Sequence, residues 1–114
     1  MQKFAIAKSS ELREGQTVKF QFVRAGKKLD GFIARFEGEI VAYENVCQHI
    51  AVNLDDESDR IFSRDGKHFI CQNHGAIYEP SSGLCVRGPC EGERLKKLKI
   101  EVSNEIIWLA ENNF

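Results

Sequence analysis

The sequence lacks any long run of apolar residues. Charged side chains interrupt its beginning repeatedly, at Lys3, Lys8, Glu11, Arg13 and Glu14, so this segment does not resemble a secretory signal peptide. No later run approaches the length that a membrane-spanning helix needs. We therefore expect no membrane contact and a free-standing cytoplasmic protein.

An excess of either charge is also missing. Sixteen Lys and Arg residues oppose seventeen Asp and Glu residues, which gives a formal net charge of −1. Such a chain has no basic surplus to neutralise phosphates, so the composition argues against a general nucleic-acid binder. No glycine-rich dinucleotide fingerprint, repeat or low-complexity segment occurs. At 114 residues we expect one domain, residues 1–114.

Cysteine and histidine are scarce, yet they occur in two mixed pairs. The pairs are Cys47-Gln48-His49 and Cys71-Gln72-Asn73-His74, with twenty-one residues between them. Each pair can therefore occupy its own loop and hold a metal centre from opposite sides. Two thiolates on one iron and two imidazoles on the other are the ligand set of a Rieske [2Fe–2S] centre. In a reducing compartment, ligands or plain thiols are favoured over a disulfide framework.

From Phe4 to Leu109 the order of parts resembles the Rieske-type ferredoxins. These small proteins are related to the ferredoxins of ring-hydroxylating dioxygenases and to the small subunit of assimilatory nitrite reductase. The resemblance implies one [2Fe–2S] cluster as cofactor. It implies Cys47 and Cys71 as ligands of the inner iron, with His49 and His74 on the outer iron near solvent.

The surroundings of these ligands follow the family in part. Gly75 lets the backbone pass close to the cluster without a Cβ atom, and Pro89 belongs to a third, rigid loop. Tyr78 stands where the family has a hydrogen-bond donor to sulfur, but Ala76 replaces the family's donor serine. Because such bonds stabilise the reduced cluster, we expect a potential toward the low end of roughly −150 to +300 mV.

Two further departures place the chain among the ferredoxin-like members. Val52 and Asn73 occupy the positions of the cysteines that form a disulfide in respiratory Rieske proteins. By the resemblance, the protein is an electron carrier rather than an enzyme. Its partners would be a flavin reductase as donor and an oxygenase or reductase as acceptor, docking at the histidine edge.

Other functions compete with this interpretation. An accessory or regulatory small subunit of a nitrite reductase-like complex is one alternative, although such subunits often lose the ligands that are intact here. A structural zinc module with the same Cys₂His₂ set is another, but zinc fingers usually place both histidines in one element. A redox sensor would need an output surface that the sequence does not show.

Three remaining features have plainer interpretations. His68, three residues before Cys71, is expected to be a structural or surface histidine. Cys85 and Cys90 are interpreted as partly buried thiols in preference to a local disulfide. The acidic run Leu54–Arg60 is a solvated loop by default, and it could also steer a basic partner.

The pattern of apolar residues predicts an all-β fold. We expect a Rieske-type antiparallel β-sandwich as base domain, about residues 1–44 and 93–114, with an inserted cluster-binding subdomain at about 45–92. The base strands are predicted at Thr17–Val23, Leu29–Phe36, Ile40–Tyr43, Leu95–Val102 and Glu105–Leu109. Short strands are predicted at His68–Cys71, Ala76–Glu79 and Leu84–Val86, and one helical turn at Ser9–Glu14.

Overall fold

The computed structural model describes residues 4–47, 53–54, 61–71 and 75–110. Within them the chain forms nine strands and one short 3₁₀ helix, and all strand pairs are antiparallel. The all-β prediction is confirmed. No helix in the described part is long and apolar enough to cross a membrane. The elements are β1 (Phe4–Lys8), η1 (Ser9–Glu11), β2 (Thr17–Arg24), β3 (Lys27–Phe36), β4 (Glu39–Glu44), β5 (Phe69–Ile70), β6 (Ile77–Tyr78), β7 (Cys85–Arg87), β8 (Ile100–Ser103) and β9 (Ile106–Leu109).

The chain divides into two compact units. The first unit combines Met1–Glu44 with Lys97–Phe114, and the second is the continuous stretch Asn45–Lys96. The first unit holds two three-stranded sheets, ordered β1-β9-β8 and β2-β3-β4. The second unit holds one sheet, ordered β5-β6-β7.

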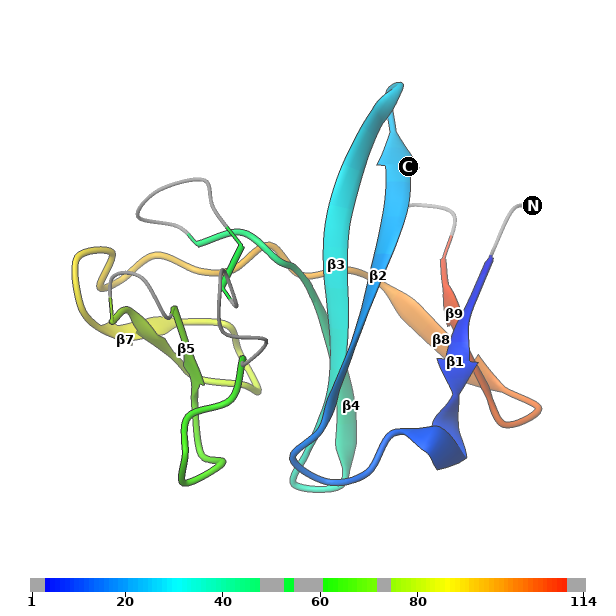
Figure 1. The fold of residues 1–114 in the computed structure, drawn as a ribbon, viewed down its shortest axis with the longest axis horizontal. Helices are drawn as coiled ribbons and strands as arrows, with labels where there is room; N and C mark the ends of the chain where they lie inside the picture. The colour runs from blue at the N-terminus through cyan, green and yellow to red at the C-terminus, as the bar shows by residue number, and fades with distance from the viewer. Residues whose placement is uncertain (1–3, 48–52, 55–60, 72–74, 111–114) are drawn as a thin grey trace. The chain divides into compact units, whose positions relative to one another are not determined.

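Tight turns set the register of the first unit. β2 and β3, the long twisted pair in Figure 1, are joined by Ala25 and Gly26, both with positive φ. This geometry fits a type I′ turn, whose twist matches that of the flanking strands. The predicted five-residue turn is therefore wrong, since pairing continues to Arg24 and Lys27.

Apolar side chains from both sheets form the core of this unit. They come from the inward positions of β2, β3, β4 and β9 and from two connecting segments: Leu12, Phe22, Ile33, Ala42, Leu98, Ile107 and Leu109. Fully burying a side chain of this size contributes about 1.5–3 kcal/mol each. The sequence analysis missed the strand β1. Phe4 and Ile6 of β1 pack against this core but are only partly buried, so buried and exposed positions alternate only weakly along the strand.

The segment before β8 corrects one prediction. Leu95–Lys99 is not a strand; only Ile100–Ser103 is. Leu95 and Leu98 are buried, and their N–H groups donate to Gly83 and Ala42 rather than to one neighbouring strand. The segment therefore has alternating apolar positions but no continuous row of backbone hydrogen bonds to one neighbouring strand.

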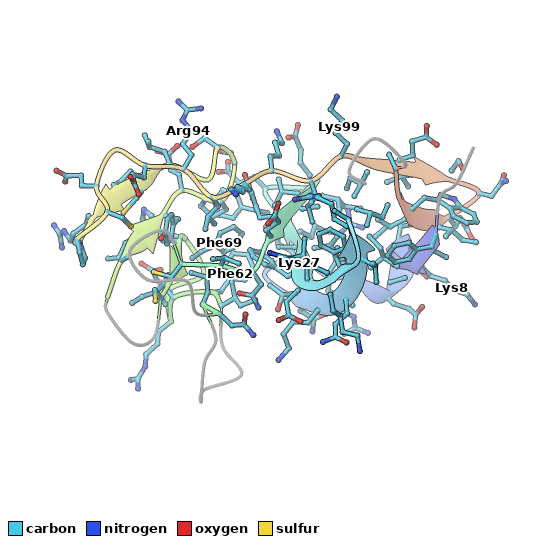
Figure 2. All side chains as sticks on the ribbon, turned by 90° about the horizontal axis from the view of Figure 1, so that it is seen from above. Lys8, Lys27, Phe62, Phe69, Arg94 and Lys99 are labelled. Carbon is cyan, nitrogen blue, oxygen red and sulfur yellow. The ribbon has the colours of Figure 1, made fainter. Side chains whose placement is uncertain are left out.

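The second unit is built around β6, the middle strand of its sheet. Phe69 of β5 pairs with Tyr78 of β6, which in turn pairs with Cys85 of β7. The rings of Phe62 and Phe69, labelled in Figure 2, pack with their centroids 5.0 Å apart. Both rings are buried, and Phe69 belongs to β5, which Cys71 directly follows.

Candidate metal centre

The two predicted cysteine ligands are buried in the second unit. Cys47 follows the end of β4, and Cys71 directly follows β5. Their exposed fractions are 2% and 0%. The four cysteines of the chain all lie in the described residues, and none of them forms a disulfide. His49 and His74 lie outside the described residues, as do Val52 and Asn73.

A buried asparagine holds the segment that carries Cys47. The side-chain Oδ1 of Asn45 accepts a hydrogen bond from the N–H of Leu54 at 2.9 Å. Asn45 is 1% exposed and Leu54 is fully buried. This bond joins two points of the chain on either side of Cys47. Sequence analysis missed Asn45, because a single asparagine after a strand is an ordinary turn signal.

Backbone hydrogen bonds close the segment that carries Cys71. The N–H of Cys71 donates to the carbonyl of Ala76, and the N–H of Gly75 donates to the carbonyl of Cys71, both at 2.8 Å. Gly75 has φ of +71°, a conformation that glycine adopts without strain. The glycine is thus required by the local backbone, beside any role in approaching a cluster.

The hydroxyl of Tyr78 lies between two sulfur atoms. Its oxygen is 3.6 Å from Sγ of Cys47 and 3.1 Å from Sγ of Cys90. Tyr78 is completely buried on the middle strand β6. The contact with Cys47 gives this hydroxyl the position that a donor to a ligand sulfur needs. The contact with Cys90 was not foreseen.

The third predicted loop packs closely against the second. Gly88 has φ of +107°, and a Cβ atom at this position would lie 2.8 Å from Cα of Ala76. Pro89, next in sequence, is exposed. Only glycine allows the two backbones to approach this closely, so Gly88 has a structural role.

Cys85 and Cys90 are buried thiols, as the sequence analysis favoured. Their sulfur atoms are 3.1 Å apart, with Cys90 donating to Cys85. Cys85 in turn donates to the carbonyl of Arg87 at 3.2 Å. Burial raises the pKa of the Cys90 thiol to about 11, against a smaller lowering by the Tyr78 hydroxyl.

The remaining predicted features lie apart from this cluster of sulfur atoms or outside the described part. His68 is half-buried, and its backbone pairs with Ser63 in the turn before β5. Of the acidic run Leu54–Arg60, only Leu54 belongs to the described residues.

The described donors fit an iron–sulfur centre. Two buried cysteines that form no disulfide would supply its thiolates, and the Tyr78 hydroxyl lies within hydrogen-bond distance of the Cys47 sulfur. Hydrogen bonds from residues around the ligands orient the ligands and adjust the reduction potential of the metal centre.

Comparison with solved structures shows the fold. The ferredoxin of carbazole 1,9a-dioxygenase from Nocardioides aromaticivorans IC177 is 20% identical with a TM-score of 0.72, and the match covers 96% of this chain and 98% of that ferredoxin. The terminal oxygenase of carbazole 1,9a-dioxygenase from Novosphingobium sp. KA1 is 22% identical with a TM-score of 0.74, covering 94% of this chain and 29% of that one. A chain in the reduced complex between oxygenase and ferredoxin in carbazole 1,9a-dioxygenase is 16% identical with a TM-score of 0.76, covering 94% of this chain and 27% of that one. Our chain thus spans less than a third of these two longer chains.

A search of curated proteins finds no match. The model of the Rieske [2Fe-2S] domain, by contrast, matches residues 2–102, which is most of the chain. This match includes both Cys/His pairs and every strand from β1 to the greater part of β8. The chain therefore belongs to the Rieske [2Fe-2S] domain family, whose cofactor is a [2Fe–2S] cluster.

Proposed function

We propose that this protein is a Rieske-type ferredoxin that carries single electrons from a reductase to an oxygenase or reductase acceptor. One observation carries the proposal. The Rieske [2Fe-2S] domain model matches residues 2–102, and a dioxygenase ferredoxin shares the fold over 96% of this chain.

We assign the cluster to the unit Asn45–Lys96, with Cys47 and Cys71 on one iron and His49 and His74 on the other. When bound, the cluster supplies a one-electron couple. The chain supplies its surroundings: burial of both cysteines excludes water from the sulfur ligands. Asn45 fixes the first ligand segment, and the Cys71–Ala76 backbone pair fixes the second. With Cys47 as a thiolate ligand, the Tyr78 hydroxyl 3.6 Å away is the donor of a hydrogen bond to its sulfur.

The partners follow from the same proposal. The related structures include a complex between an oxygenase and a ferredoxin of one dioxygenase. We therefore propose an oxygenase as the favoured acceptor and a flavin reductase as the donor, with docking at the edge that carries His49 and His74. We place this exchange in the cytoplasm.

Metal and sulfide analysis of the purified protein tests the cofactor. We expect about two irons and two acid-labile sulfides per chain and an uptake of one electron in a reductive titration. A stoichiometric zinc content without sulfide would instead show a structural Cys₂His₂ site.

A pair of histidine variants tests the ligands. His49→Ala removes a proposed ligand, so the Rieske electron paramagnetic resonance spectrum is expected to disappear. His68→Ala is the matched control, because His68 lies in the turn beside Ser63 and is expected to leave the spectrum unchanged. A normal spectrum in His49→Ala would show that the ligands are wrongly assigned.

A further inference from the structure

The cysteines that no ligand role uses are arranged as a pair. Cys85 and Cys90 are 1% and 5% exposed, and their sulfur atoms are 3.1 Å apart. A disulfide requires about 2.05 Å between the sulfurs. The two atoms therefore need to approach by only about 1 Å to bond.

Backbone hydrogen bonds fix both ends of the loop between them. The N–H of Cys85 donates to the carbonyl of Glu93 at 2.7 Å, and the N–H of Gly92 donates to the carbonyl of Cys85 at 2.9 Å. Glu91 also donates to Gly88 at 3.2 Å. These bonds bring Cys90 back toward Cys85, so the pair can bond without unfolding the loop.

The same pair reaches the metal centre through Tyr78. The Tyr78 hydroxyl has one proton and two sulfur neighbours, Cys90 at 3.1 Å and Cys47 at 3.6 Å. With Cys47 as a thiolate ligand, its charged sulfur is the stronger acceptor of the hydrogen bond from this hydroxyl. The Cys90 sulfur, whose own proton goes to Cys85, faces the hydroxyl as a second, weaker acceptor that competes for this hydrogen bond. The raised pKa of Cys90 keeps that thiol proton in place at neutral pH.

We propose that Cys85 and Cys90 form an oxidisable dithiol, a modification site that adjusts the reduction potential through Tyr78. Hydrogen peroxide is the oxidant: both thiols lose their protons, the S–S bond forms, and two electrons break the O–O bond to give two waters. In the disulfide the Cys90 sulfur is bonded to Cys85 and is a weaker acceptor for the Tyr78 hydroxyl. The hydroxyl then donates more strongly to Cys47, and the potential becomes more positive. The potential effect rests on the proposed function, whereas disulfide formation does not.

Peroxide treatment of the metal-loaded protein tests the site. After alkylation of the remaining thiols, peptide mass spectrometry should find Cys85 joined to Cys90, with the visible spectrum of the cluster retained. Voltammetry should then show a positive shift that a thiol reductant reverses. Since the two sulfurs are buried, the reaction is expected to be slow compared with that of an exposed thiol.

Cys85→Ala is the matched control. It keeps the Cys90 thiol beside Tyr78, so its starting potential should stay near that of the parent protein, and peroxide should produce neither the disulfide nor the shift. Bleaching of the cluster before any Cys85–Cys90 disulfide forms would overturn the proposal, and so would a disulfide with an unchanged potential. Zinc in place of iron would contradict the proposed function alone, because disulfide mapping still decides whether the dithiol exists.

Discussion

The hydroxyl of Tyr78 lies within hydrogen-bond distance of two buried sulfur atoms, those of Cys47 and Cys90. Its 3.6 Å contact with Cys47 predicts that Tyr78→Phe lowers the reduction potential. Ala76→Ser, at a fully buried position paired with Cys71, should add a donor and raise it. We expect about 30–60 mV each, or roughly 0.7–1.4 kcal/mol for a one-electron couple. Voltammetry of both variants in one buffer must give shifts of opposite sign.

The pKa of Asp65, in the turn before β5, can be tested by mutation of its hydrogen-bond donor. Its carboxylate accepts hydrogen bonds from the Ser63 hydroxyl at 2.6 Å and from the N–H of Lys67 at 3.0 Å. The Ser63 bond is the largest cause that lowers the pKa of Asp65 below 3.8. A carboxyl whose pKa is lower in the folded state than in the unfolded state stabilises the fold at pH values above the unfolded-state pKa. This contribution disappears as the pH falls through the folded-state pKa. Ser63→Ala should move the pKa of Asp65 up toward 3.8 in an NMR titration, whereas Ser82→Ala should leave it unchanged.

For single residues, the sequence predicts which side chains could bind or tune a metal better than it predicts which side chains contact one another. The Cys/His pairs and Tyr78 are recognisable because their residue types and spacing follow a motif. Asn45 and the link from Cys90 to Tyr78 are not, since these contacts depend on how the chain folds back between distant positions. No local pattern encodes them.

Among the loops, a comparison of Gly88 with Gly92 distinguishes the strain of a positive φ from the steric clash of an added Cβ atom. Both have φ near +100°, but a Cβ atom at Gly88 meets the backbone of Ala76 at 2.8 Å, while one at Gly92 meets nothing within 4 Å. Gly92→Ala should therefore cost only backbone strain, about 1 kcal/mol. Gly88→Ala adds a backbone displacement and should cost about 2–5 kcal/mol. Urea unfolding measures both; equal losses would show that the close approach to Ala76 is unimportant.

The strands illustrate why elements are predicted more readily than their ends. The aromatic and branched residues of β2 and β3 identify both strands, but the two-residue turn at Ala25–Gly26 was expected to be five residues long. The turn at Asn104–Glu105 is likewise one position later than expected. Charged residues such as Lys27 pair as readily as apolar ones at a hairpin end, so hydrophobicity does not mark the boundary.

For the whole molecule, the two units predict an uneven response to loss of the metal. The first unit has its own apolar core, whereas the proposed ligands all lie in the second. Removal of iron by a chelator should speed hydrogen exchange in β5 and β6 at least tenfold, or about 1.4 kcal/mol, and leave β2 to β4 protected. Hydrogen-exchange mass spectrometry resolves the two sets of strands. An equal loss of protection in both would contradict this separation.

The pairing of β1 with β9 has a consequence for synthesis on the ribosome. Lys8 pairs with Ile106, so the first strand finds its neighbour only when nearly all of the described chain has been made. The β2-β3-β4 sheet and the complete Asn45–Lys96 stretch emerge earlier. Lys96 and the start of β9 at Ile106 are about 10 residues apart, a delay of about 0.5–2 s at about 5–20 residues per second. The ligand-bearing stretch is therefore complete before β9 can pair with β1 in the first unit.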